Sequence, residues 1–221
     1  MTQRSSFLAG EGDAWFSRNL PAGEDASHDH VASILTDIGG RPRSVLEIGC
    51  SNGSKLARLC AAFGCAGTGI DPSVRAIEDG RARHPKLRLA VGTAESLPFP
   101  DGEFDLVIFG FCLYLCDRQD LFRIAAEADR CLSDGGMLAI TDFMPPTQYR
   151  NPYCHMDGVY SYKFDCRRMF LWNPAYFERS LKVYGHGGSS SLAPDHRTST
   201  VILQKDLANA WPACPDWNSN A

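Results

Sequence analysis

The sequence lacks the features that would place it in a membrane or on nucleic acid. No apolar run approaches the ~20 residues that a membrane-spanning helix needs. Residues 1–10 contain Arg4 but no hydrophobic region, so we expect no secretory signal there. There is no dense run of Lys or Arg, and the net charge is −4. Tight binding to nucleic acid or to an anionic membrane is therefore not favoured.

Paired cysteines are also missing, although cysteine itself is plentiful. None of the nine cysteines forms a C-x-x-C pair, and none has the spacing of a zinc site. Several, such as Cys60, Cys112 and Cys131, fall in helix or strand patterns, where a free thiol acts as a small apolar side chain. We therefore expect structural thiols, no metal site and a reducing cytoplasm.

A short stretch, Ser44–Gly53, organises the rest of the chain. Val45, Leu46 and Ile48 predict a short buried strand, into which the carboxylate of Glu47 is set. Two glycines, Gly49 and Gly53, then bracket a tight turn into a helix expected over Ser54–Phe63. Strand, glycine turn and helix make the first crossover of an open parallel sheet, in which ligands lie outside the carboxyl ends of the strands. The 221 residues fit one α/β domain, since single domains commonly have ~100–250 residues.

The glycine spacing in this stretch argues against a dinucleotide. A dinucleotide site needs G-x-G-x-x-G, whereas this chain has E-x-G-x-x-x-G, with Ser51 in place of the second glycine. The carboxylate of Glu47 would repel a phosphate and suits a cationic or hydrogen-bond-donating ligand. At these residues the sequence resembles the class I (Rossmann-like) S-adenosylmethionine-dependent methyltransferases, of the stand-alone small-molecule type. The resemblance covers roughly residues 44–142.

The resemblance implies a fold and a cofactor. The fold is α/β, with a doubly wound, mostly parallel seven-stranded sheet, helices on both faces and an antiparallel last strand. The cofactor is S-adenosylmethionine, and its product is S-adenosylhomocysteine. Strands are expected at residues 67–70, 87–91, 104–109 and 137–141, with a helix at 118–132 and a tight turn at 133–136.

Two acidic residues follow strands of this core at positions that the family uses. Asp71, after the second strand, is expected to accept hydrogen bonds from ribose hydroxyls, or else to cap the helix that begins beyond Pro72. Glu95, after the third strand, matches the residue that bonds the adenine amine, or else is a solvated loop carboxylate. The resemblance assigns these residues to the cofactor: Glu47, Gly49, Cys50, Ser51, Asn52, Gly53, Asp71, Pro72, Thr93, Ala94, Glu95, Gly110, Phe111, Leu115 and, from a closing N-terminal segment, Arg18 and Asn19.

The flanking segments divide into five parts of a single domain, 1–221. Residues 1–43 are an N-terminal cap, loosely organised up to Asp25, with a covering helix at 27–38; residues 44–142 are the cofactor-binding core. Residues 143–173, rich in aromatic and cationic side chains, are expected to form a substrate lid, or else an ordinary packed insertion. Residues 174–205 are expected to contain a helix from Pro174 to Leu181 and strands at 182–185 and 198–203, before a tail at 206–221.

The acceptor is predicted less sharply than the cofactor. The polar and aromatic lid favours a small molecule, such as a metabolite, natural product or sugar-type compound, methylated at oxygen or nitrogen. His155 is the first candidate base, followed by Tyr160, Tyr162 and Asp142, or else His155 is a histidine of a surface loop. The Asn/Asp-Pro-Pro-Tyr/Phe element of nucleic-acid amine methyltransferases is absent after the fourth strand. A protein or RNA methyltransferase, a non-catalytic cofactor-binding partner protein and, more weakly, a dehydrogenase stay open. The oligomeric state is not readable.

Overall fold

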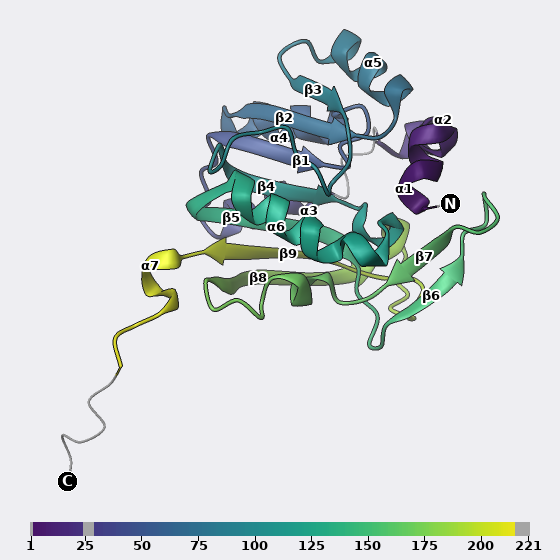
Figure 1. The fold of residues 1–221 in the computed structure, drawn as a ribbon. Coiled ribbons are helices and arrows are strands. Elements are labelled where there is room, and N and C mark those ends of the chain that lie inside the picture. Colours follow the sequence, from purple (N-terminus) through teal and green to yellow (C-terminus); the bar gives the residue numbers. More distant parts are fainter. Residues whose placement is uncertain (1, 24–28, 215–221) are drawn as a thin grey trace.

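A seven-stranded sheet forms the centre of the computed structural model, which describes residues 2–23 and 29–214 (Figure 1). The strand order is β3-β2-β1-β4-β5-β9-β8. β1 to β5 run parallel, and β9 is antiparallel to both of its neighbours. The strands are β1 Ser44–Ile48, β2 Ala66–Asp71, β3 Arg88–Val91, β4 Phe104–Gly110, β5 Leu132–Phe143, β8 Tyr176–Gly185 and β9 Arg197–Lys205. The predicted sheet, mostly parallel with an antiparallel last strand, is confirmed.

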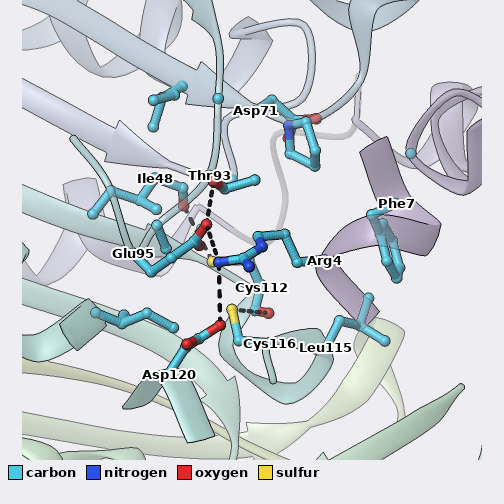
Figure 2. A pocket seen from close by; sticks show the side chains of 18 of the residues that line it. Arg4, Phe7, Ile48, Asp71, Thr93, Glu95, Cys112, Leu115, Cys116 and Asp120 are labelled. Carbon is cyan, nitrogen blue, oxygen red and sulfur yellow. Dashed lines mark hydrogen bonds and ion pairs between the residues drawn. The ribbon is translucent and has the colours of Figure 1, made fainter. Parts of the chain in front are cut away.

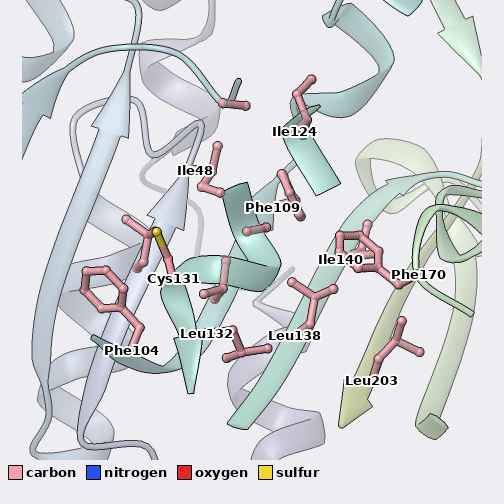
Figure 3. Packing of buried hydrophobic residues seen from close by; sticks show 14 of the residues in the cluster. Ile48, Phe104, Phe109, Ile124, Cys131, Leu132, Leu138, Ile140, Phe170 and Leu203 are labelled. Atoms are coloured by element: carbon pink, nitrogen blue, oxygen red, sulfur yellow. The ribbon is translucent and has the colours of Figure 1, made fainter. Parts of the chain in front are cut away.

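Both faces of the sheet are covered because its central strands are apolar on both sides. In β4, Val107 and Phe109 pack into the cluster beneath α6 (Leu121–Cys131), which Figure 3 shows. Leu106 and Ile108 point the other way, into the cluster under the remaining helices. Those helices are α3 His30–Asp37, α4 Ser54–Phe63 and α5 Val74–Arg83. A strand buried on both faces needs this continuous apolar run, as the sequence predicted for β4.

The chain reverses its direction across the sheet between β1 and β4. It runs outward from β1 to β3 and then returns to place β4 on the other side of β1. Such a switch point opens a crevice at the carboxyl ends of the strands. Beside these ends lie the N-terminal helices and a two-stranded hairpin (Figure 1). The helical segments are α1 Gln3–Ser6, η1 Phe7–Glu11 and α2 Gly12–Gly23, and the hairpin is β6 Tyr149–Pro152 with β7 Tyr160–Lys163.

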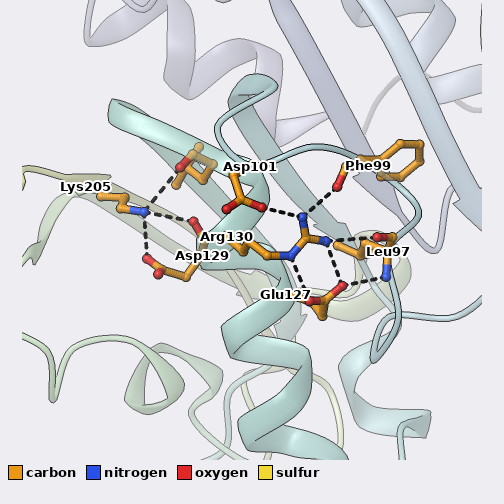
Figure 4. A network of polar contacts seen from close by, with 8 residues as sticks. Leu97, Phe99, Asp101, Glu127, Asp129, Arg130 and Lys205 are labelled. Carbon is orange, nitrogen blue, oxygen red and sulfur yellow. Dashed lines mark hydrogen bonds and ion pairs between the residues drawn. The ribbon is translucent and has the colours of Figure 1, made fainter.

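A polar network fixes the loop after β3 to helix α6 (Figure 4). The Arg130 guanidinium donates to the carbonyl oxygens of Phe99 (2.6 Å) and Leu97 (2.9 Å) and pairs with Glu127 (2.9 Å). A Glu127 oxygen also accepts from the Leu97 amide at 2.8 Å. Bonds that combine ionised groups with main-chain groups are among the stronger ones in proteins. They hold the far end of the loop that carries residues 93–95 to the edge of the crevice.

The helix predicted over Pro174–Leu181 is wrong. This segment begins the edge strand β8, whose Leu181 pairs with Val201 of β9. A proline followed by scattered apolar residues favoured a helix start in the sequence. The strand forms instead because β9, about twenty residues further along, supplies a complete antiparallel ladder. Local propensity gives way to such long-range pairing at sheet edges.

Two other segments also differ from expectation. The N-terminal lead-in is helical from Gln3 onward, and Thr2 caps α1 by accepting from the Ser5 amide. The turn predicted at 133–136 lies inside β5, as a bulge that shifts its register against β4. The covering helix is observed as α3. The remaining described elements are the 3-10 turns η3 Leu113–Leu115, η4 Arg118–Asp120, η5 Cys166–Met169 and η6 His186–Gly188 and the short helix α7 Leu207–Ala210. Residues 27–28 of the predicted helix and 215–221 of the tail lie outside the described residues.

Candidate functional site

One cavity opens at the switch point, between the carboxyl ends of the parallel strands and the N-terminal helices (Figure 2). Its volume is about 110 Å³. Strand ends and the loops that follow them form its floor, whereas α1, η1 and α2 form its roof. The residues that line it include Ile48, Gly49, Ile70, Asp71, Pro72, Thr93, Ala94, Glu95, Gly110, Phe111, Cys112 and Leu115 from the floor and Arg4, Phe7, Gly12 and Trp15 from the roof.

The turn after β1 has the backbone geometry that its glycines predicted. Gly49 and Gly53 both have φ of +75°, and Ser51 has φ of +51°. The Gly49 amide donates to the carbonyl oxygen of Ile70 at 2.8 Å, which ties the turn to the end of β2. A Cβ on Gly49 would stand 2.6 Å from that of Cys112, closer than real atoms come. Gly49 lines the cavity, so this turn brings bare backbone to the ligand.

Asp71 joins the ends of β1 and β2. One of its carboxylate oxygens accepts from the Ser51 amide at 2.8 Å and the other from the Ser73 amide at 2.9 Å. Burial raises the pKa of Asp71 to about 6, against the opposing effect of these two amides. Ser73, not Asp71, caps helix α5, since its side chain accepts from the Ala76 amide. The capping alternative for Asp71 is therefore excluded, and its carboxylate lines the cavity.

At the other end of the cavity, Glu95 already has two partners (Figure 2). Its Oε1 accepts from the Thr93 hydroxyl at 2.6 Å and from the Arg4 guanidinium at 3.1 Å. Arg4 also reaches Asp120 at 3.5 Å. The hydrogen bond that Arg4 donates to Glu95, first, and the negative charge of Glu95 raise the pKa of Arg4. The roof is thus fastened to the floor by a cation, which a ligand at Glu95 would have to displace or share.

Glu47 lies beneath Gly110, on the opposite side of the cavity floor. A Cβ on Gly110 would meet Glu47 Oε1 at 2.8 Å. Glu47 lines a smaller cavity of about 40 Å³, whose wall also includes His30, Lys55 and Gly110. Glu47 Oε2 is buried without a hydrogen-bond partner among the described residues. Burial raises the pKa of Glu47 to about 8, and the nearby Lys55 opposes this shift. Such an orphaned carboxyl group suits a cationic ligand group.

Seven of the positions assigned to the cofactor lie outside the main cavity, Glu47 among them. Arg18 is paired with Glu11 and donates to the Tyr153 hydroxyl at 3.0 Å, and Asn19 donates to the Trp15 carbonyl oxygen at 2.9 Å. The other four belong to the turn after β1 but do not line the main cavity: Cys50, Ser51, Asn52 and Gly53. Among them, buried Asn52 donates to Asp79 at 2.8 Å.

The three candidate catalytic residues are not brought together. Asp142 is buried, accepts from the amides of Tyr114 (3.2 Å) and Phe143 (2.7 Å), and thereby holds η3 against β5. Burial raises its pKa to about 7. His155 is exposed in the connection of the hairpin, edge-on to Tyr153 at 5.2 Å. Tyr160 lies in β7 and lines neither the main cavity nor the smaller one beside Glu47.

Sequence reasoning expected an N-terminal cap over the cofactor site but assigned Arg18 and Asn19 in it to the cofactor, whereas Arg4, Phe7 and Trp15 are the residues of the roof that line the cavity. It also missed the backbone conformation of one floor residue. Phe111 has φ of +61°, which is rare for a bulky residue, and its ring stacks on His186 at 5.1 Å. Strained backbone of this kind gathers at functional sites. No sequence signal shows it, because glycine is the only residue type that announces a positive φ.

Three buried carboxyl groups make the stability of the unliganded protein depend on pH. The pKa values of Glu47, Asp71 and Asp142 are raised to about 8, 6 and 7, whereas the unfolded chain releases these protons near pH ~4. The folded state therefore binds more protons above pH 4, and stability falls as pH rises through these pKa values. His84, whose pKa burial lowers, contributes weakly in the opposite direction. We expect the free energy of unfolding, measured with urea, to be larger at pH 5 than at pH 8 by at least about 1 kcal/mol.

The control for this prediction is the double variant Glu47→Gln with Asp142→Asn, which removes two of the titrating groups. Its free energy of unfolding should change less between pH 5 and pH 8 than that of the natural sequence. A free energy that rises with pH in both proteins would contradict the assignment of buried, protonated carboxyl groups.

Residues 2–23 and 29–214 contain neither a metal-binding cluster nor a helix that could span a membrane. These residues contain no cluster of three or more His, Cys, Asp or Glu side chains arranged to hold a metal ion. Within the same ranges, every helix is too short or too polar to cross a membrane.

A family model matches the middle of the chain, and curated relatives match about half of its length. A model of the methyltransferase domain matches residues 45–136. An uncharacterized methyltransferase of Synechocystis is 32% identical over 127 residues, 58% of either chain. A fatty-acid O-methyltransferase of Mycolicibacterium smegmatis is 35% identical over 52% of this chain and 42% of its own. A demethylmenaquinone methyltransferase of Tropheryma whipplei is 33% identical over 49% and 45%. The matches span about half the length of these curated relatives.

Solved structures extend the likeness to nearly the whole chain. A 1,6-didemethyltoxoflavin-N1-methyltransferase of Burkholderia thailandensis, with S-adenosylhomocysteine bound, has a TM-score of 0.70 at 18% identity and covers 92% of this chain and 87% of its own. A SAM-dependent methyltransferase of Methanosarcina mazei has a TM-score of 0.63 at 20% identity, covering 79% and 97%. At these identities the likeness shows the fold alone. The strand order and the cavity after β1 and β2 agree with this fold, and residues 45–136 match a methyltransferase domain, so the chain has the class I methyltransferase fold around that domain.

Proposed function

We propose that this protein transfers the methyl group of S-adenosylmethionine to an oxygen or nitrogen atom of a small-molecule acceptor. The observation that carries the proposal is the position of Gly49, Asp71 and Glu95, which follow three adjacent parallel strands and line one cavity. In that order they fit the methionine, ribose and adenine parts of the cofactor. Asp71 would accept from the ribose hydroxyls and Glu95 from the adenine amine.

Glu47 would favour the cationic end of the cofactor from beneath the floor. Its unpartnered Oε2 and its raised pKa leave it ready to ionise when a positive group comes near. Gly110 separates Glu47 from the main cavity without a side chain, so the charge acts across backbone alone. Arg18 and Asn19 would act indirectly, by holding α2 and Trp15 in the roof.

The transfer itself asks mainly for alignment and for exclusion of water. The hairpin is the candidate lid, because Gln3 bridges it to the floor: its side chain donates to the Leu115 carbonyl oxygen at 2.6 Å and accepts from the Tyr160 amide at 2.9 Å. An acceptor hydroxyl would also need a base. His155 and Tyr160 on the hairpin, and Asp142 at the end of β5, are the candidates for this role.

A small acceptor is favoured over a macromolecule by the closed roof and by the net charge of −4. The relatives and the structural neighbour named above include methyltransferases of a fatty acid, of demethylmenaquinone and of 1,6-didemethyltoxoflavin, all of them small molecules. A partner protein that binds the cofactor without turnover has no specific observation in its favour, since Gly49 and Asp71 are intact at the cavity.

Calorimetric titration with S-adenosylmethionine, S-adenosylhomocysteine and NAD tests the first half of the proposal. We expect dissociation constants in the micromolar range, about −8 kcal/mol, for the first two ligands and no binding of NAD. Formation of S-adenosylhomocysteine is then measured in the presence of carboxylic, phenolic and amine acceptors. The proposal fails if neither S-adenosyl compound binds. Binding without turnover on any acceptor, including protein and RNA extracts, would favour the non-catalytic alternative.

A further inference from the structure

A larger cavity lies apart from the cofactor site, between the hairpin β6–β7 and the start of α6. Its volume is about 360 Å³, within the range of sites for small organic ligands. The segments at 145–150, 162–165 and 118–121 form most of its wall, and Arg168 of η5 completes it. It shares no lining residue with the main cavity. It is therefore separate from the cavity that Gly49, Asp71 and Glu95 line.

The charges that line this cavity do not balance. Four cations line it, Arg118, Arg150, Lys163 and Arg168, against the single carboxylate of Asp165. That carboxylate is already neutralised from outside the wall, because Arg167 donates to both of its oxygens, at 2.9 and 2.8 Å.

Of the four cations, only Lys163 has a carboxylate partner. Its ammonium group lies 3.0 Å from Oδ1 of Asp195. Three arginine side chains thus line one cavity, and none of their guanidinium groups is within ion-pair distance of a carboxylate among the described residues.

Arg118 has a buried hydrogen-bond donor that no acceptor satisfies among the described residues. It donates to the carbonyl oxygens of Leu113 and Cys116, but its Nη1 is buried with no hydrogen-bond partner among the described residues. Its guanidinium lies over the ring of Tyr162, 4.6 Å from the centroid. A buried donor without an acceptor costs free energy that a bound acceptor would recover. Arg150, over the Tyr160 ring at 4.3 Å, and Arg168 keep their own donors available.

We propose that this cavity binds an oxyanion, the phosphate or carboxylate group of a small molecule, between Arg118, Arg150 and Arg168. Guanidinium groups match the oxygens of both anions with paired hydrogen bonds. The wall of the cavity around Tyr149, Tyr162 and Pro145 leaves room for the organic part that carries the anion. The two chemical sources, phosphate and carboxylate, are distinguished by the probes below.

The test is calorimetric titration with pyrophosphate and, separately, with benzoate, at constant ionic strength and without S-adenosylmethionine. We expect saturable binding of at least one probe, weakened about tenfold by Arg150→Gln and about tenfold by Arg168→Gln. The probe that binds identifies the anion. Arg118 is left intact because it also holds η3. Arg150 and Arg168 are exposed, so both variants should unfold at the temperature of the natural sequence.

The matched control is Arg41→Gln, which removes the same charge from an exposed position before β1. It should leave binding of the probe unchanged. The proposal is overturned if neither probe binds, or if Arg41→Gln weakens binding as much as the cavity variants do, since the effect would then be one of net charge. None of these outcomes depends on methyl transfer, so failure here and failure of the proposed function are separate results.

Discussion

Replacing Asp71 with alanine is expected to weaken S-adenosylmethionine binding by about 1.5–3 kcal/mol, roughly 10- to 150-fold. Under the proposed function this carboxylate accepts the ribose hydroxyls, and hydrogen bonds to a charged group are worth this much. It also accepts from the Ser51 and Ser73 amides, so its loss loosens the turn after β1 as well. Calorimetric titration with S-adenosylmethionine and S-adenosylhomocysteine measures both effects together.

Two further variants separate the causes. Asp71→Asn keeps one acceptor of the same shape and should lose less affinity than Asp71→Ala. Asp37→Ala removes an exposed carboxylate at the end of α3 and should bind the cofactor as the natural sequence does. Unchanged affinity in Asp71→Ala would remove the ribose assignment and with it the orientation of the cofactor proposed here.

The pH of the titration affects the result. Because burial raises the pKa of Asp71 to about 6, a part of the protein carries a neutral Asp71 below that pH. A ribose hydroxyl donates to a carboxylate more strongly than to a carboxylic acid. The difference between the natural sequence and Asp71→Ala should therefore be largest at pH 8 and shrink toward pH 5.

The core of the fold could be predicted because its signals are local. β1 and β4 are mostly apolar and buried, and glycines with positive φ follow β1 and precede α4. Each of these features is fixed by residues within a few positions of one another. Asp71 and Glu95 could be placed for the same reason, since the position just after a parallel strand fixes where its side chain lies.

What could not be predicted depends on contacts between distant segments. β8 becomes a strand only because β9 pairs with it, and the bulge at 133–136 exists because β4 continues alongside. Arg4 reaches Glu95 across 91 positions of sequence, and no local pattern marks it. Arg18 and Asn19 were chosen because the resemblance implies an N-terminal segment that closes the cofactor site, whereas their polar groups bond to Glu11, Tyr153 and the Trp15 carbonyl oxygen.

Replacing Gly49 with alanine is expected to destabilise the fold by about 2–5 kcal/mol and to abolish measurable cofactor binding. Two costs add: an L-residue at φ of +75°, and a Cβ placed 2.6 Å from that of Cys112. The collision cannot be relieved by a side-chain rotation, because both atoms are fixed to the backbone. Either the turn after β1 or η3 must move, and residues from both line the cavity. Urea unfolding and calorimetric titration measure the two losses.

Gly39→Ala supplies the control that isolates the conformational cost. Gly39 has φ of +71°, but nothing stands within 4 Å of an added Cβ, so this variant should lose only about 1–2 kcal/mol. Adding Cys112→Gly to Gly49→Ala removes the colliding atom and should recover part of the stability and of the binding. If Gly49→Ala costs no more than Gly39→Ala, the close approach of η3 to the turn does not constrain this position. The bare backbone at Gly49 would then be needed for the left-handed turn alone.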